Sequence, residues 1–335
     1  MAKRLGINLG FPVSAAQREE LVRSAQVADD LGVDSVWVAE AWGRDAFTLL
    51  TEVALKTRSI KLGTAIVNVF SRSPAVLAMT AASIDELSGG RMILGLGSSG
   101  ANVIEHWHGV PFQKPLTRLG EYVEIINRIV ARRRLLYEGE LFRLKRGFRL
   151  DLEPVRKHIP IYIAAITPRS IEQTGRLADG WIPIFWPKDH FQDGIGQLMK
   201  GAQAAGRERP DLTVAPSIGL YVTDGDDGGE VRSRARQPIA LYVGRMGVFY
   251  YQMLQRLGFE REVEEIRAAS ERRDPEGAAA AVSDRMLEAT AVVGSLEECR
   301  EKLDERRALG VDLPIVNLPA GSAMEVGKVL EGLLA

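Results

Sequence analysis

The sequence predicts an α/β protein built on a (β/α)8 barrel, and three observations support this. Short β-rich runs alternate with longer amphipathic stretches from the first residues onward. The apolar runs number eight, which is the number that closes a barrel. The first run is followed by GFPVSAAQ, without the glycine-rich phosphate turn found there in open doubly wound sheets.

The eight predicted strands are short apolar runs separated by turn residues or helical stretches. They cover residues 4–11, 35–40, 60–68, 91–98, 159–166, 180–186, 212–222 and 313–319. Between them, stretches 16–32, 46–57, 74–90 and 117–133 place apolar residues at three-and-four spacing, which predicts amphipathic helices. Proline at helix starts (Pro74, Pro168) and glycine at helix ends (Gly32, Gly89) agree with these boundaries.

Two connections are longer than a minimal barrel needs. Such a barrel takes about 250 residues, whereas this chain has 335. Segment 138–158 alternates like a small hairpin before the fifth strand, and a helical insertion is expected around 223–295, with the aromatic cluster GVFYYQML inside it. No repeat longer than the βα unit and no low-complexity linker is present, so residues 1–335 are predicted to form one domain.

Composition excludes several classes of partner. The net charge is −1 and the pI about 6.5, which gives no reason to expect a nucleic acid partner. The amino-terminal stretch lacks the apolar region of a signal peptide, and no apolar run reaches the ~18 residues of a membrane helix. The single cysteine, Cys299, cannot form an internal disulfide. We therefore expect a cytoplasmic protein that acts on a small-molecule substrate, with no membrane partner.

Polar residues at the carboxyl ends of strands are the first candidates for function, because reacting groups in such barrels lie there. Glu40 ends the second strand, and a carboxylate placed directly after an apolar run needs a partner. That partner is either a neighbouring arginine or a bound ligand. Asn68 ends the third strand, where an amide either hydrogen-bonds a heterocycle edge or forms a turn.

Two loops have the composition of anion-binding sites. In GLGSSGAN, residues 95–102, small side chains let backbone N–H groups approach an anion, although such loops also serve as plain turns. In AAITPRS, residues 164–170, Thr167 precedes a helix that begins at proline, and the free N–H groups of a helix start attract phosphate. Arg169 is placed either to contact that anion or to remain solvated.

Four aromatic residues near strand ends form the predicted substrate pocket: Phe11, Trp42, Phe185 and Trp186. Wide rings at a barrel mouth suit a flat ligand, although ordinary packing also uses such residues. His106 and His108 have a spacing that a metal accepts, but no third ligand stands nearby in the sequence, so no metal site is predicted. No nucleophile elbow, Cys–His arrangement or P-loop is present.

Taken in order, these segments resemble the bacterial luciferase-like superfamily, and within it the branch dependent on deazaflavin (coenzyme F420) that includes methylenetetrahydromethanopterin reductase. The matching stretches cover most of the chain up to Trp186, and they are DSVWVAEAWGRDAF, KLGTAIVNVFSRSPAVLAMTAASIDELSGGRMILGLGSSG, HWHGVPF and IPIYIAAITPRSIEQTGRLADGWIPIF. The resemblance implies hydride transfer between coenzyme F420 and a small organic substrate at the carboxyl face of the barrel.

The resemblance also implies roles for individual residues. A non-prolyl cis peptide is expected at Ala65–Ile66, bulging toward the back of the cofactor ring. Asn68 corresponds to a position that touches the ring. Glu40 corresponds to an acidic residue at the polar edge of the ring and is the first candidate for tuning or proton exchange. The loops expected to hold the cofactor tail contain Gly97, Ser98 and Ser99, together with Ala164, Ala165, Ile166 and Thr167.

Two other functions fit the same barrel: a flavin mononucleotide (FMN) monooxygenase supplied by a partner reductase, and a non-catalytic flavin-binding barrel. Ala41 stands where the sugar-phosphate dehydrogenases of this branch have histidine, so glucose-6-phosphate is not the expected substrate. Family members often pair through their second and third helices. The apolar face of residues 75–84 permits a homodimer, but burial within the monomer would explain that pattern equally well.

Overall fold

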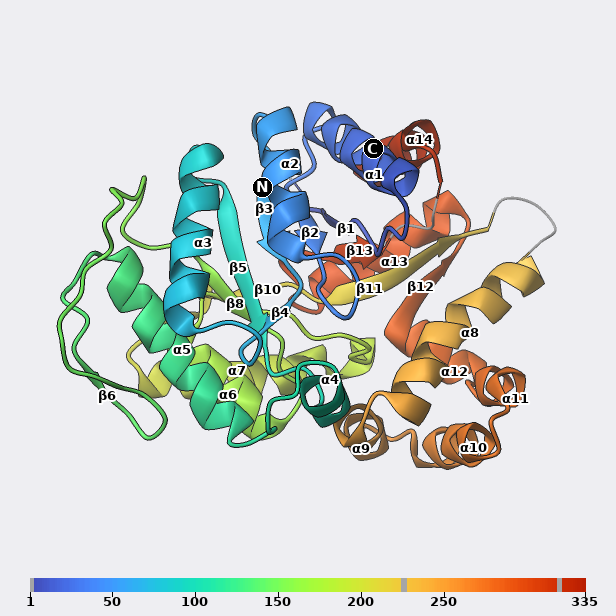
Figure 1. The fold of residues 1–335 in the computed structure, drawn as a ribbon. Helices are drawn as coiled ribbons and strands as arrows, with labels where there is room; N and C mark the ends of the chain where they lie inside the picture. Colours follow the sequence, from blue (N-terminus) through green and yellow to red (C-terminus); the bar gives the residue numbers. More distant parts are fainter. Residues whose placement is uncertain (1–2, 224–227, 318–320) are drawn as a thin grey trace.

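The computed structural model describes residues 3–223, 228–317 and 321–335, and it contains a curled parallel sheet with helices around its outside (Figure 1). The strands follow one another in the order β10-β9-β8-β5-β3-β2-β1-β13-β11-β12, with β4 paired to β5. Their bounds are β1 (Gly6–Asn8), β2 (Ser35–Val38), β3 (Lys61–Thr64), β4 (Val67–Asn68), β5 (Met92–Gly97), β8 (Ile161–Ile163), β9 (Gly180–Trp181), β10 (Thr213–Val214), β11 (Ser217–Val222), β12 (Ala291–Gly294) and β13 (Ile315–Asn317).

The sheet curls back on itself because residues 213–222 contribute strands to both of its ends. β10 pairs with β9, and β11, which begins three residues after β10 ends, pairs with β13, which in turn pairs with β1. A further bridge joins Ile184 to Ser217. This arrangement is consistent with the predicted barrel. Each of the eight predicted strands contains a strand of the structure, although residues 318 and 319 of the last one lie outside the described residues.

Large side chains fill the inside of the curled sheet. Trp37 and Tyr162 are buried there with their ring centroids 5.6 Å apart. The strands beside them carry glycine where these rings need room: a Cβ atom at Gly63 would lie 2.2 Å from the Trp37 ring, and one at Gly180 would lie 2.6 Å from the Tyr162 ring. The interior is therefore a packed core rather than a channel.

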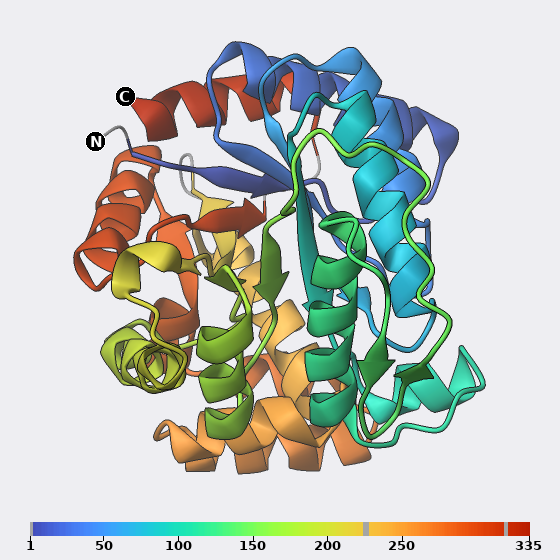
Figure 2. The same ribbon diagram turned by 90° about the vertical axis from the view of Figure 1, so that its left-hand side faces the viewer.

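The helices that alternate with the strands begin where the sequence provides capping groups. Ser14, Asp45, Ser73 and Thr167 each accept a hydrogen bond from a backbone N–H in the first turn of the following helix. Figure 2 shows these helices packed around the outside of the strands. They are α1 (Ala15–Asp30), α2 (Ala46–Lys56), α3 (Pro74–Leu87), α4 (Ala101–His106), α5 (Pro115–Val130), α6 (Pro168–Leu177), α7 (Phe191–Ala204), α13 (Leu296–Ala308) and α14 (Ala323–Leu334).

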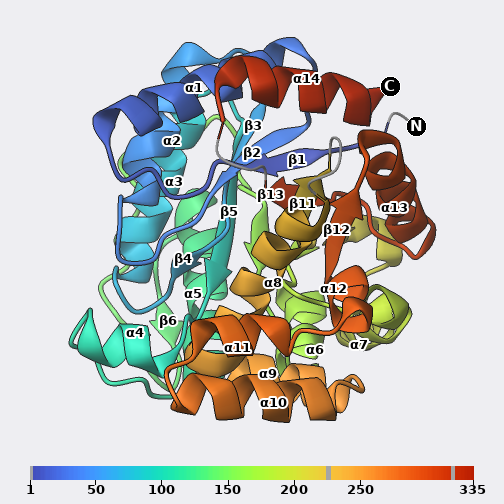
Figure 3. The ribbon, with the colours of Figure 1, turned by 90° about the vertical axis from the view of Figure 1, so that its right-hand side faces the viewer.

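Five further helices follow β11 and gather at one end of the sheet, beside α4 (Figure 3). They are α8 (Gly228–Arg245), α9 (Val248–Arg256), α10 (Glu260–Glu271), α11 (Pro275–Ala280) and α12 (Asp284–Thr290). The stretch 223–295 was predicted to be helical, and this is wrong at its end, because residues 291–294 form β12 and pair in parallel with β11. Residues 224–227 of that stretch lie outside the described residues.

The segment after α5 contains a hairpin shorter than the predicted 138–158: β6 (Tyr137–Glu138) pairs antiparallel with β7 (Arg143–Leu144), and residues 145–158 form no strand. The buried Glu121 side chain accepts hydrogen bonds from the backbone N–H groups of Glu140, Leu141 and Phe142, and so fixes the turn to α5. In the described part of the chain, no helix has both the length and the apolar character needed to span a bilayer.

Candidate active site

The candidate site lies at the carboxyl ends of the strands, one layer above the packed interior. Side chains alternate between the two faces of a strand, so the residue two positions after an inward-facing one also faces inward. The inward-facing residues are Gly6, Trp37, Gly63, Ile93, Tyr162, Ile182, Ala215 and Ile315. The residues two positions further along, which we call the mouth layer, are Asn8, Ala39, Ala65, Gly95, Ala164, Ile184, Ser217 and Asn317.

The mouth layer has two unlike halves. On the neighbouring strands β2, β3, β5 and β8 its members are Ala39, Ala65, Gly95 and Ala164, which we call the small half. The other half contains Ile184 and three polar side chains, which belong to β1, β11 and β13. A flat, largely apolar ligand therefore finds most room over the small half.

A bulge shapes the small half at Ala65 and Ile66. Gly63 of β3 pairs with Ile93 of β5, and Val67 of β4 pairs with Leu96 of the same strand. The chain from Gly63 to Val67 therefore contains one residue more than the part of β5 opposite it. The peptide bond Ala65–Ile66 is cis, which confirms the predicted geometry. Both residues are half-buried and pack on the interior core.

The neighbouring strand accommodates the bulge through two glycines. Gly95 N donates to Thr64 Oγ1 at 2.8 Å, and Thr64 Oγ1 donates to the Gly95 carbonyl at 2.8 Å. A Cβ atom at Gly95 would lie 1.7 Å from the Thr64 carbonyl oxygen, and one at Gly97 would lie 2.9 Å from Ile66 Cδ1. Only glycine allows this close approach at position 95. The hydrogen bonds of Gly95 with Thr64 lie before the bulge and the contact of Gly97 with Ile66 lies at it, and together they fix its backbone.

Glu40 is held by an ion pair, one of the two alternatives that the sequence left open. Arg72 Nη1 and Nη2 donate to its two oxygens at 2.6 and 2.8 Å, and Ala46 N donates to Oε2 at 3.2 Å. The hydrogen bond to Glu40 raises the pKa of Arg72, and Asp45 accepts from the same guanidinium. The Glu40 side chain is only 8% exposed. The sequence did not identify Arg72 as the partner, because it lies on another loop.

Asn68 combines turn formation with a second contact. Its Oδ1 accepts from Phe70 N at 2.9 Å and from Ser71 N at 2.8 Å, so the amide group is fixed with Nδ2 pointing away from the turn. Nδ2 lies 3.4 Å from His108 Nε2. The imidazole of His108 therefore stands beside the candidate site, a position that its spacing from His106 did not indicate. Among the described residues, no group of three potential ligands is arranged to hold a metal ion.

The two predicted anion loops lie on the adjacent strands β5 and β8. Ser98 and Ser99 follow β5 as half-buried residues, with Ser99 at φ 58°. Thr167 caps α6: Ser170 N donates to its Oγ1 at 3.3 Å, and its own N–H donates to Ser170 Oγ at 3.0 Å. Arg256 on α9 donates to the Ile166 carbonyl at 2.9 Å and brings a cation to this loop that the sequence did not predict.

The four predicted aromatic residues do not form one pocket. Phe185 is half-buried beside Tyr242 of α8, with ring centroids 4.9 Å apart, and Trp42 is 55% exposed. Trp186 turns away from the mouth: it is buried against Trp181 and α7, and its Nε1 donates to the His190 carbonyl at 2.9 Å. Its placement in the substrate pocket is therefore corrected. The reason is that the strand ends before Trp186: Phe185 has a φ of 53°, so the alternation of side chains between the two faces does not continue to residue 186.

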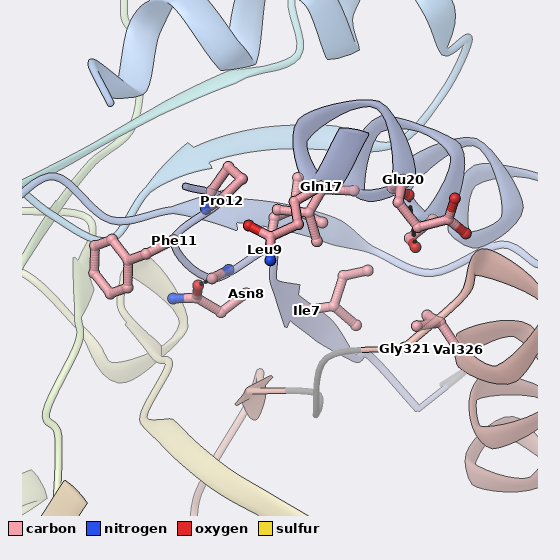
Figure 4. Close-up of a pocket in the computed structure, with 12 residues that line it drawn as sticks. Ile7, Asn8, Leu9, Phe11, Pro12, Gln17, Glu20, Gly321 and Val326 are labelled. Atoms are coloured by element: carbon pink, nitrogen blue, oxygen red, sulfur yellow. Dashed lines mark hydrogen bonds between the residues drawn. The ribbon is translucent and has the colours of Figure 1, made fainter. Parts of the chain in front are cut away.

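Phe11 lines a separate cavity of about 240 Å³ (Figure 4). This cavity lies between β1, α1 and α14, and its lining includes Ile7, Leu9 and Val326 together with the mouth-layer residue Asn8. Ile7 and Leu9 belong to the outer core, so the cavity opens beside the barrel and not over the cis bulge. We take the mouth layer as the candidate site, because the strand ends, the bulge and both anion loops meet there.

Comparison with known proteins agrees with this geometry. The family model described as luciferase-like monooxygenase matches residues 6–313. Rv3520c of Mycobacterium tuberculosis, named as an inferred coenzyme F420-dependent oxidoreductase, is 32% identical over 96% of both chains. The 5,10-methylenetetrahydromethanopterin reductase of Archaeoglobus fulgidus is 31% identical over 90% of both. The structure of the coenzyme F420-dependent tetrahydromethanopterin reductase of Methanopyrus kandleri superposes with a TM-score of 0.84 at 24% identity, covering 100% of this chain and 98% of that one.

A curled parallel sheet with helices around its outside defines an α/β fold that is consistent with the TIM-barrel class. The match over residues 6–313 identifies the particular family: the chain belongs to the luciferase-like monooxygenase family.

Proposed function

We propose that this protein is a coenzyme F420-dependent oxidoreductase that transfers a hydride between the deazaflavin and a small organic substrate. The observation that carries the proposal is the small half of the mouth layer, which contains the cis bond at Ala65–Ile66 and includes strands β5 and β8, the two strands that the anion loops follow. The relatives named above at 31–32% identity carry the names of F420-dependent or methylenetetrahydromethanopterin-reducing enzymes, which supports the same conclusion.

The residues present fit such a cofactor. Ala39, Ala65, Gly95 and Ala164 leave space for a planar ring, and Gly97 keeps the neighbouring backbone close to Ile66. Ser98, Ser99 and the first turn of α6 would hold the anionic tail, because backbone N–H groups and the helix amino terminus favour negative charge there. Arg256 would add a positive charge beside the same loop.

Bound deazaflavin supplies a ring carbon that accepts or gives a hydride without activating oxygen. The protein's contribution is then orientation and the exclusion of water. Glu40 and Arg72 fix the loop after β2, and Asn68 fixes the turn after β4 and positions His108. His108 is the group best placed near this loop to exchange a proton with a substrate, because both Glu40 oxygens are already occupied by Arg72.

Titration of the purified protein with F420 and, separately, with FMN tests the proposal, with fluorescence quenching as the measurement. We expect micromolar binding of F420 and at least tenfold weaker binding of FMN. Tighter binding of FMN would favour the monooxygenase alternative, and millimolar or weaker binding of both would contradict a flavin-type function. For turnover, we expect the absorbance of oxidised F420 to fall when an alcohol gives it a hydride, or to reappear when an imine or alkene accepts a hydride from reduced F420. Oxygen alone should not restore the absorbance.

A further inference from the structure

The polar half of the mouth layer contains a group of side chains that the cofactor proposal does not use. Asn8, Ser217 and Asn317 come from three distant parts of the sequence, but strand register brings them together. Asn8 pairs with Asn317 across β1 and β13, and Ser217 pairs with Ile315, two residues before Asn317. All three are half-buried, so none of them is sealed from solvent.

Their mutual hydrogen bonds show which atoms remain available. Asn8 Oδ1 accepts from Gly10 N at 2.8 Å, which turns the Nδ2 donors of this amide outward. Asn317 Nδ2 donates to Ser217 Oγ at 3.3 Å, which leaves Asn317 Oδ1 as an acceptor and the Ser217 hydroxyl proton as a donor. These three side chains therefore offer donors at Asn8 Nδ2, at the second N–H of Asn317 Nδ2 and at the Ser217 hydroxyl, and an acceptor at Asn317 Oδ1, all from adjacent strands.

The chemistry of the three groups is neutral. Two carboxamides and a hydroxyl carry no charge, and no charged side chain takes part in their recorded hydrogen bonds. A half-buried carboxylate or phosphate would lose its hydration here without gaining a cation, whereas an uncharged amide would exchange hydrogen bonds with water for hydrogen bonds with protein. The arrangement thus favours a neutral ligand that presents an acceptor next to a donor.

We propose that Asn8, Ser217 and Asn317 bind the substrate through an uncharged amide-like group, such as a primary amide or the edge of a lactam ring. This inference rests on the proposed function, which places the deazaflavin over the small half. The substrate would then lie on the other half of the same mouth, with its amide edge held by the three side chains and its reacting carbon directed toward the ring.

An amide-like edge occurs both in the proposed substrate and at the pyrimidine end of a deazaflavin, so either molecule could in principle bind these three side chains. The proposal assigns the three side chains to the substrate, since the small half, with the bulge at Ala65–Ile66, lies on the neighbouring strands β2, β3, β5 and β8. An effect of these residues on F420 affinity alone would assign them to the cofactor and would overturn the proposal.

The test uses full-length protein saturated with F420 and two matched pairs of probes, nicotinamide with nicotinate and benzamide with benzoate. Dissociation constants are measured by saturation-transfer difference NMR. We expect each amide to bind at least tenfold more tightly than its carboxylate. Asn317→Leu and Asn8→Leu should each reduce this ratio about tenfold, which corresponds to one lost hydrogen bond. F420 affinity, measured by fluorescence quenching, should change less than threefold.

Two further variants keep the result interpretable. Ser217→Ala removes a single oxygen and is expected to fold, so a severalfold loss of amide preference with an unchanged melting temperature supports the site. Asn127→Leu on α5 changes the same residue type away from the mouth and should leave the ratio unchanged. Equal binding of amides and carboxylates by the F420-bound wild type would overturn this inference alone, whereas failure of the wild type to bind F420 would overturn the proposed function.

Discussion

Glu40 lies at a strand end, where catalytic residues are expected, but its carboxylate is held in an ion pair with Arg72. The sequence places a carboxylate at the end of a buried strand, and the structure gives both of its oxygens to Arg72. Arg72 also contacts Asp45, and its backbone carbonyl accepts from Tyr122 at 2.8 Å. A carboxylate held in this way orients a loop, and protonating it would break the pair. We therefore assign Glu40 a positioning role.

Replacement of Glu40 by glutamine should reveal this role. Because the guanidinium loses a charged, mostly buried partner, we expect the free energy of unfolding to fall by about 2 kcal/mol. Urea denaturation measures this change, and Glu86→Gln on the exposed face of α3 should leave the free energy unchanged. With F420 and any substrate that is turned over, the pH profile of kcat should keep its position. A lost or displaced limb in that profile would make Glu40 a proton carrier after all.

The two glycines of β5 should respond differently to a single added methyl group. Gly95→Ala would place a Cβ atom 1.7 Å from the Thr64 carbonyl oxygen, so we expect it to destabilise the fold by at least about 3 kcal/mol or to prevent folding. Gly97→Ala would meet side-chain atoms and no backbone, with Ile66 Cδ1 at 2.9 Å as the nearest, so the protein should fold but bind F420 at least tenfold more weakly. Gly43→Ala has open space around it and is the control. Normal F420 affinity in Gly97→Ala would place the ring elsewhere.

At the scale of whole elements, buried carboxylates tie helices to neighbouring loops. Asp29, at the end of α1, is only 7% exposed and accepts from Arg58 N at 2.6 Å, Ser59 N at 3.0 Å, Ser59 Oγ at 2.6 Å and Ile60 N at 2.7 Å. Burial acts to raise the pKa of Asp29, but these hydrogen bonds outweigh it and the net pKa is lowered. The carboxylate therefore stabilises the junction between α1 and β3.

The sign of this shift predicts a pH dependence. A lowered folded-state pKa means that the stabilisation is present above the pKa of the unfolded chain, about 3.9, and is lost as the pH falls through the folded-state value. Asp29→Asn should cost about 2 kcal/mol of unfolding free energy at neutral pH and progressively less in acid. Urea denaturation over a pH series measures this. Asp30→Asn, whose side chain is 66% exposed, is the control, and a cost independent of pH would contradict the assignment.

Helix α9 contacts the loop between β8 and α6 through Arg256, which donates to the Ile166 carbonyl. Burial lowers the pKa of the Arg256 guanidinium. We expect Arg256→Gln to weaken F420 binding about tenfold and to make that binding less sensitive to salt, because one charge contact to the anionic tail is lost. Fluorescence titrations at several NaCl concentrations measure both effects. Arg261→Gln on the exposed side of α10 should change neither, and unchanged binding in Arg256→Gln would exclude Arg256 from the tail site.

At the scale of the whole molecule, the regular part of the fold could be predicted and the long-range part could not. The alternation of strands and helices is a local pattern, and so are the caps, the hairpin and the start of α6 at Pro168. β12 was missed because the short apolar run AVVG, residues 291–294, directly follows α12, and a run this short cannot be told from the end of a buried helix by its pattern alone. Its partner, the far half of β11, is distant in sequence.

The candidate site likewise contains residues that could be predicted from local sequence motifs and residues that could not. The bulge, both anion loops and Glu40 lie within continuous motifs that the sequence displays. Arg72, Arg256 and the polar half of the mouth layer depend on contacts between separate loops or on strand register. One signal was present but unused: Gly6 and Asn8, Ala215 and Ser217, and Ile315 and Asn317 are each two residues apart, so polar residues follow buried ones on the same face.

The outer face of α3 leads to a proposal about assembly. Leu77, Ala78 and Ala81 are buried in the monomer, which explains much of the apolar pattern of residues 75–84. Val76 and Met79, however, are 45% and 54% exposed on the other face of the same helix. Val76 and Met79 are three residues apart on one helix, and adjoining exposed apolar side chains can form part of an interface. We propose that two copies associate through α3.

Replacing Val76 and Met79 together by glutamate should separate the copies, since a twofold interface brings each new charge near its own counterpart. Light scattering after size-exclusion chromatography should give about 74 kDa for the wild type, twice the 36.8 kDa of one chain, and about 37 kDa for the double variant. Met324→Glu, at a position 72% exposed on α14, should remain dimeric. A wild-type mass of one chain at micromolar concentration would contradict the dimer. The mouth layer is built from a single chain, so F420 affinity should survive separation of the copies.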